Sequence, residues 1–137
     1  MNAEIITDLI KQATDAREKS HSPYSSFAVG AALLCSDGKV YTGANIENAS
    51  FTPTVCAERV ALFTALHAGE REFAAIAVVG GPADRSAEKL FTPCGVCRQV
   101  LSEFCKPDMR VLIGAENETL TTTLGELMPF GFGKESM

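Results

Sequence analysis

The chain has 137 residues, of which 46% are hydrophobic and 21% are charged, with no low-complexity tract. This length fits a single domain with its own hydrophobic core, and the composition argues against intrinsic disorder. The net charge of -5 and the scattered lysines and arginines disfavour a nucleic-acid partner. No apolar run approaches the roughly 20 residues that span a bilayer, and the N-terminal segment lacks a signal-peptide core, so we expect a cytoplasmic protein without a membrane partner.

Hydrophobic periodicity and turn signals predict the elements of the chain in order. Apolar residues recur at helical spacing in the first segment, and Pro23 ends it because the residue before a proline avoids helical geometry. The turn at Asp37-Gly38 joins two apolar runs into a β-hairpin, and Gly69 ends a buried helix. The sequence Thr123-Leu124-Gly125-Glu126 has the spacing of a capping box and predicts a short helix. The predicted elements are a helix over 3–19, strands over 27–35 and 40–44, a loop over 45–55, a helix over 56–67, a strand over 73–79, a loop over 81–93, a helix over 95–104, a strand over 109–113 and the short helix that ends at Pro129.

Helices and strands alternate along most of the chain, which indicates a sheet covered by helices on both faces. We therefore predict an α/β fold, a three-layer α/β/α sandwich with a mixed sheet. The antiparallel hairpin should lie at one side of this sheet, with parallel strands beyond it. We expect residues 1–137 to form a single domain, because the chain shows no internal repeat and no linker.

Two cysteine-containing segments carry the chemistry that the sequence predicts. One is Cys56-Ala57-Glu58-Arg59, and the other is Pro93-Cys94-Gly95-Val96-Cys97, which opens a predicted helix. The C-x-x-C spacing lets two thiolates bind one metal ion, and a helix N-terminus favours the thiolate over the thiol. Disulfides rarely persist in a reducing cytosol, so an odd number of cysteines, five here, favours free thiols and a metal site.

The number of ligands separates a catalytic metal site from a structural one. A structural zinc ion is normally held by four protein ligands, whereas Cys94 and Cys97 are joined only by Cys56 at a predicted helix start. Three ligands leave one coordination position for water, and Glu58 is then placed near that position without being a ligand. Zinc deaminases have this pattern: a His or Cys ligand, a glutamate two residues later and a downstream P-C-x-x-C. Taken alone, the C-x-x-C also fits a redox pair or a structural zinc half-site.

The chain resembles the small cytidine deaminases over nearly its whole length. Cysteine at position 56, where deaminases of nucleic acids and nucleotides usually carry histidine, resembles the branch that acts on free nucleosides. The segments that carry the resemblance are Ser22-Pro23-Tyr24-Ser25-Ser26-Phe27-Ala28-Val29-Gly30-Ala31-Ala32-Leu33, Gly43-Ala44-Asn45-Ile46-Glu47-Asn48-Ala49-Ser50, Cys56-Ala57-Glu58-Arg59, Pro93-Cys94-Gly95-Val96-Cys97-Arg98-Gln99-Val100 and Leu127-Met128-Pro129.

The resemblance implies a set of substrate contacts. Asn45 and Glu47 would hold the sugar, because an amide and a carboxylate can hydrogen-bond its hydroxyls. Phe27 would form a wall of the pyrimidine pocket, with Ala57 also in contact with the substrate, and Phe132 would close the pocket of a neighbouring subunit. Each has a simpler alternative: Asn45 can cap a turn, and Phe27 can pack in the core.

The resemblance also implies one Zn²⁺ per subunit, a homotetramer with sites shared between subunits, and a role for Arg59. Three thiolates on Zn²⁺ carry a net charge of -1, which an arginine hydrogen-bonded to the sulfurs would offset. A surface salt bridge is the alternative for Arg59. Cys35 lies in an apolar strand and is expected to pack as a small hydrophobic residue, Cys105 lies near a helix end, and neither is assigned to the metal.

The implied activity is hydrolytic deamination of cytidine and deoxycytidine to uridine and deoxyuridine, with release of ammonia, in pyrimidine salvage. Glu58 would carry protons as general base and then general acid. Three alternatives remain: a deaminase of a modified cytosine nucleoside such as blasticidin S, a non-catalytic zinc or redox module, and a nucleic-acid editor.

Overall fold

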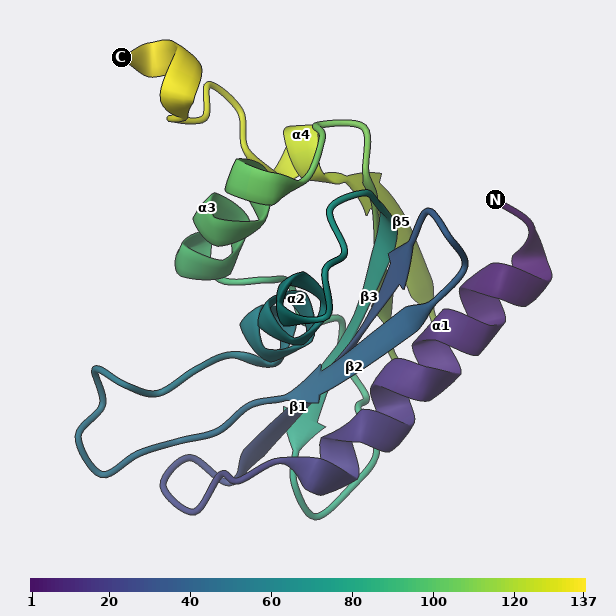
Figure 1. Ribbon diagram of the computed structural model, residues 1–137. Coiled ribbons are helices and arrows are strands. Elements are labelled where there is room, and N and C mark those ends of the chain that lie inside the picture. The colour runs from purple at the N-terminus through teal and green to yellow at the C-terminus, as the bar shows by residue number, and fades with distance from the viewer.

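The computed structural model describes all residues, 1–137, and contains a mixed five-stranded sheet with helices on both of its faces (Figure 1). This confirms the predicted α/β fold, and most element boundaries agree with prediction within two residues. The helices are α1 (Ala3–Ala16), α2 (Ala57–His67), α3 (Gly95–Phe104) and α4 (Leu124–Leu127), with 3₁₀ turns η1 (Arg17–Lys19) and η2 (Lys134–Ser136); the strands are β1 (Phe27–Cys35), β2 (Val40–Ala44), β3 (Phe73–Pro82), β4 (Arg110–Gly114) and β5 (Thr119–Thr123).

The sheet has the strand order β2-β1-β3-β4-β5. Only the pair β3–β4 is parallel, and the other three pairs are antiparallel. Helix α1 covers one face of the sheet, while α2 and α3 lie on the other (Figure 1). The parallel pair is connected through α3, as a crossover between parallel strands requires.

The buried side chains form two hydrophobic clusters, one on each face of the sheet. Alternate residues of a strand point to opposite faces, so Leu33 and Ile76 belong to the cluster under α2, whereas Ala32 and Ala77 belong to the cluster under α1. The larger cluster has sixteen members and includes Cys35 and Cys105. Its other members are Val29, Ala31, Ala57, Ala61, Leu62, Ala65, Val78, Leu101, Met109, Val111, Ile113 and Leu124.

Two sheet predictions were wrong. The strand predicted over 73–79 continues to Pro82, because Gly80, Gly81 and Pro82 pair with the start of β1. Strand β5 was not predicted, and the short segment TLTTT shows why: it lies at the sheet edge, its first residues are exposed, and it lacks the alternation of buried apolar residues that marks a strand. The two strands expected to be parallel beyond the hairpin, β3 and β4, are parallel, and β5 adds an antiparallel edge strand to them.

No helix of the chain is both long enough and apolar enough to cross a bilayer. The short helix α4 is capped by Thr123 as predicted, and the Thr123 side chain accepts a hydrogen bond from the backbone N–H of Glu126. Beyond it the C-terminal residues leave the sheet layers and run past α3 (Figure 1).

Candidate active site

Two helix N-termini bring the cysteines of the separated motifs together. Cys56 is the N-cap of α2 and Cys94 is the N-cap of α3, and neither side chain caps its own helix with a hydrogen bond. Cys97 lies in the first turn of α3 and is buried. Both helices therefore direct the positive ends of their dipoles at the sulfurs, which stabilises negative charge on the thiolates.

The sulfur spacing fits a tetrahedral zinc ion. The Sγ atoms of Cys56, Cys94 and Cys97 all lie within 4.8 Å of one another. The Cys56–Cys94 pair is 3.8 Å apart. Two sulfurs that bind zinc at about 2.3 Å with a tetrahedral angle are separated by about 3.8 Å, so this pair needs no rearrangement. Three sulfurs leave a fourth position free for a water molecule or a substrate atom.

Glu58 lies next to this cluster, in the first turn of α2. Its side chain is 1% exposed, and its Oε1 has no hydrogen-bond partner in the protein. Burial raises the pKa of the carboxyl to about 7, against the hydrogen bond that it receives from the backbone. Leaving one oxygen of a buried carboxyl without a hydrogen bond costs free energy. This indicates that a bound molecule supplies the missing partner.

Arg59 provides the positive charge at the cluster. Its Nη2 donates to Cys56 Sγ at 3.3 Å, whereas its buried Nε has no partner. A hydrogen bond from Cys97, followed by the one from Arg59, lowers the pKa of the Cys56 thiol to about 5 despite its partial burial. The guanidinium thus lies against the sulfurs and does not form a surface salt bridge, the alternative that the sequence left open for it.

A second group of polar side chains lies at the start of β1 and the end of β2. Asn45 is 9% exposed; its Nδ2 donates to Phe27 O at 2.9 Å, and its Oδ1 accepts from Val29 N at 2.9 Å and from Ser20 Oγ at 2.6 Å. Both acceptor positions of the amide oxygen are filled, so only one N–H of Asn45 remains for another molecule.

Glu47 is held by the loop that precedes β1. Its Oε1 accepts from the backbone N–H groups of Tyr24 and Ser25 at 3.0 and 3.1 Å, and its Oε2 accepts from Ser25 Oγ. The hydrogen bond from the Ser25 side chain is the main reason that the pKa of Glu47 is lowered. Ser25 Oγ also accepts from Phe27 N at 3.0 Å, so one short network positions Glu47 and Phe27 together.

A close contact between β2 and α2 joins the two groups of side chains. A Cβ at Gly43 would lie 2.6 Å from Ala57 O and 2.5 Å from Ala61 N, so only glycine allows the strand this near the helix. Farther along, Ile46 and Val55 exchange two backbone hydrogen bonds of 3.0 Å each. Since Ile46 lies between Asn45 and Glu47, and Val55 precedes Cys56, the polar pair and the thiol cluster are neighbours.

The other two predicted site residues, Ala57 and Phe132, lie in separate parts of the structure. Ala57 is fully buried at the first position of α2, between Cys56 and Glu58. Phe132 lies on the C-terminal tail, 59% exposed, and its carbonyl accepts from Gln99 Nε2 at 3.0 Å. It borders a hollow with Ser102 and Lys106 at the C-terminal end of α3, and none of Cys56, Cys94 and Cys97 lines that hollow.

Sequence reasoning did not identify Ser20 and Ser25 as parts of the site. Both serines lie in short polar segments. From the sequence, a serine there that bonds to a distant side chain cannot be distinguished from one whose hydroxyl faces solvent. Ser25 lies in the Ser-Pro-Tyr-Ser-Ser segment that carries part of the resemblance, so this was a usable signal for it. Cys35 is 1% exposed and packs in the core as expected, and Cys105, which is 9% exposed, belongs to the same cluster.

The N-termini of two helices converge on three thiols and a buried carboxyl beside a mixed sheet. This architecture is that of a metal-dependent hydrolase site. Comparison with known proteins gives the family. Residues 3–115 match the model of the cytidine and deoxycytidylate deaminase zinc-binding region. The chain therefore belongs to this family of zinc-binding deaminases.

The relatives extend over almost the full chain. It is 48% identical over 130 residues to a cytidine deaminase of Halalkalibacterium halodurans, covering 94% of this chain and 95% of that protein. It is 44% identical over 133 residues to one of Sporosarcina psychrophila, covering 96% and 94% respectively. The crystal structure of a cytidine deaminase from Burkholderia pseudomallei superposes with a TM-score of 0.85 at 47% identity, covering 96% of this chain and all of that one.

Proposed function

We propose that this protein catalyses the hydrolytic deamination of cytidine and deoxycytidine to uridine and deoxyuridine, with release of ammonia. The observation that carries the proposal is Glu58, a buried carboxyl with an unpartnered oxygen beside three clustered thiols, in a chain of the zinc-binding deaminase family. The near-full-length relatives that are named cytidine deaminases support cytosine nucleosides as the substrate class.

Cys56, Cys94 and Cys97 would hold the zinc ion, and Arg59 would offset the charge of the thiolates through its bond to Cys56 Sγ. Bound zinc lowers the pKa of a water molecule towards neutrality and so makes the nucleophile available at neutral pH. All remaining steps belong to side chains of the protein.

Glu58 would move the protons of the reaction. Its Oε1 takes one proton from the attacking water and delivers it to ring N3, which makes C4 of the pyrimidine electrophilic. After the oxygen has bonded to C4, Glu58 passes the second proton to the amino group, and the C4–N bond breaks to release ammonia. One water is consumed, and oxygen replaces nitrogen on C4. The raised pKa of Glu58 suits a group that must accept and donate a proton near neutral pH.

Asn45 and Glu47 would bind the sugar with opposite hydrogen-bonding roles. The free N–H of Asn45 can only donate, and the ionised carboxylate of Glu47 can only accept. A hydroxyl group satisfies both, because it accepts one hydrogen bond and donates another. Phe27 would lie along the pyrimidine, with its backbone N–H bonded to Ser25 and its carbonyl bonded to Asn45.

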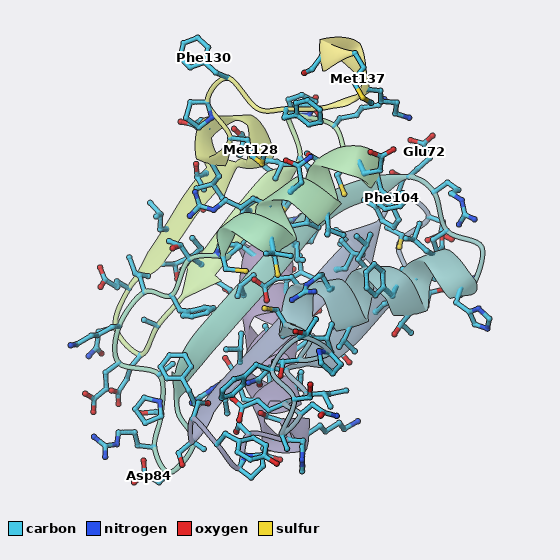
Figure 2. The ribbon with its side chains drawn as sticks, turned by 90° about the vertical axis from the view of Figure 1, so that its left-hand side faces the viewer. Glu72, Asp84, Phe104, Met128, Phe130 and Met137 are labelled. Carbon is cyan, nitrogen blue, oxygen red and sulfur yellow. The ribbon has the colours of Figure 1, made fainter.

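The proposal includes a homotetramer in which Phe132 of one subunit closes the pocket of another. Its support is that Phe132 is exposed on the tail and borders a hollow that none of Cys56, Cys94 and Cys97 lines. Figure 2 shows the tail as well, with the Phe130 side chain pointing away from the body of the protein. A sedimentation experiment that finds a fully active monomer would overturn this part.

None of the five cysteines forms a disulfide, which supports a reducing compartment, and for this protein we take that compartment to be the cytoplasm.

The decisive experiment combines zinc analysis with a deamination assay on the purified protein. We expect about one zinc ion per chain and a loss of cytidine absorbance as uridine forms, with deoxycytidine also converted. The same assay should include blasticidin S, because a blasticidin-S deaminase of Bacillus cereus is 35% identical over 108 residues. Faster turnover of blasticidin S than of cytidine would reassign the substrate, and no turnover of any cytosine nucleoside by the zinc-loaded protein would refute the proposal.

A further inference from the structure

Arg17 is a buried arginine whose positive charge meets no acidic side chain. It is 9% exposed and lies in η1, directly after α1. Its Nε donates to Ala28 O at 2.8 Å, and its Nη2 lies within hydrogen-bonding distance of three further carbonyls, those of Gly81 (2.9 Å), Pro82 (3.0 Å) and Arg85 (3.3 Å). Burying a charge without an opposite charge beside it costs free energy, so a buried arginine of this kind indicates a specific role and not packing alone.

The four carbonyls come from segments that meet beside Phe27. Ala28 follows Phe27 in β1, and Pro82 is the residue that pairs with Phe27 across the sheet. Arg85 lies farther on, in the loop that leaves β3 towards the cysteines of α3. The guanidinium therefore ties the start of this loop to the strand that begins with Phe27.

The same loop brings Phe91 against the Phe27 ring. The two ring centroids are 5.4 Å apart with an interplanar angle of 44°. Gly80 leaves the space for this contact, because a Cβ there would lie 2.8 Å from Phe91 and 3.2 Å from Phe27. The two rings and the nearby Leu90 also border a cavity of about 390 Å³, so the Phe27 ring would have room to move if Phe91 withdrew.

We propose that Arg17 is a positioning residue for substrate binding: it holds the 83–91 loop against β1 and so keeps Phe91 packed on Phe27. This inference rests on the proposed function, in which Phe27 lies along the pyrimidine. Arginine suits the task because its planar fork donates in two directions at once, to β1 through Nε and, through Nη2, to the end of β3 and to the Arg85 carbonyl of the loop. A lysine ammonium keeps the charge but cannot reach both sets of carbonyls in this way.

The test compares Arg17→Lys and Phe91→Ala with the wild-type enzyme, both zinc-loaded. We expect the KM for cytidine to rise about fivefold in each variant while kcat stays within about twofold, since only the wall of the pocket is loosened. The double variant should show much less than the product of the two effects, because both act through the Phe27 ring. Arg85→Ala is the matched control: it removes an exposed side chain of the same loop and keeps the carbonyl that Arg17 binds, so KM should not change.

Limited digestion with trypsin tests the loop without reference to activity. Lys89 is an exposed cleavage site in this loop, and Arg17→Lys should speed cleavage after it, whereas Arg85→Ala should not. Unchanged cleavage at Lys89, or an unchanged KM in Phe91→Ala, would overturn the inference. A zinc-loaded wild-type enzyme that leaves cytidine unconverted would instead refute the proposed function, and that result is distinct from either of these. If Arg17→Lys does not fold, Arg17→Gln replaces it in both measurements, with the same expected rise in KM and faster cleavage after Lys89.

Discussion

The Glu58→Gln substitution distinguishes proton transfer by Glu58 from a zinc site without catalytic activity. Glutamine keeps the shape of the side chain but cannot accept and return a proton. A general acid–base group contributes about 10² to 10⁴ in rate, so we expect kcat to fall by about that factor. This corresponds to about 3–5 kcal/mol of activation free energy at 1.36 kcal/mol for each tenfold change.

The same substitution should not weaken the fold. Glu58 is 1% exposed and its Oε1 has no partner, so the wild-type protein bears the cost of a buried, incompletely bonded carboxyl. A neutral amide is less costly to bury than a carboxylate, and we expect the free energy of unfolding to rise by about 1 kcal/mol. For a domain of this size that is an increase in Tm of about 3–5 °C.

The assay follows cytidine absorbance at saturating substrate, with zinc content and Tm measured on the same preparations. Glu70→Gln is the matched control, since Glu70 is a half-buried carboxylate of the loop after α2 that bonds to Tyr41 and lies near Cys35, outside the group of Cys56, Cys94 and Cys97. Its kcat should remain at the wild-type level. If Glu58→Gln keeps its zinc and retains kcat within about threefold of wild type, the role of Glu58 in proton transfer is refuted.

Three further predictions concern the metal, the sugar contacts and the helix–strand contact. The Cys97→Ala variant should lose bound zinc, whereas Cys35→Ala, which changes a cysteine of the core, should keep it. Metal analysis after dialysis measures both. Equal zinc content in the two variants would count against Cys97 as a ligand. Ser25→Ala removes the main cause of the lowered pKa of Glu47, so that pKa should rise towards its ordinary 4.5. The ionised carboxylate of Glu47 binds the sugar above this pKa, and that binding is lost as the pH falls through it. As the pH is lowered, KM of Ser25→Ala should therefore start to rise at a higher pH than KM of the wild type. Superimposable KM–pH profiles would contradict this. Gly43→Ala places a Cβ 2.5 Å from the α2 backbone and should lower stability by about 1–3 kcal/mol in denaturant unfolding, and an unchanged midpoint would show that α2 can shift freely.

Much of the chemistry could be predicted from local sequence because it depends on short spacings. The interval between Cys94 and Cys97 is one helical turn, and Glu58 follows Cys56 by two residues, so each motif forms as soon as its helix forms. The helices and the central strands were also predictable, because burial on one or both faces imposes a periodic apolar pattern. Strand β5 escaped prediction because an exposed edge strand of threonines has no such pattern.

Only the tertiary structure decided which distant groups meet. The 3.8 Å separation of Cys56 and Cys94, the approach of β2 to α2 at Gly43 and the hydrogen bonds of Asn45 and Glu47 join segments far apart in the chain. Arg17 is the clearest case, since in the sequence it is one more charged residue at a helix end, and in the fold it is buried with carbonyl partners up to 68 positions away. Residue type and spacing determine what a side chain can do, whereas its partners and its burial depend on the packing of the whole chain.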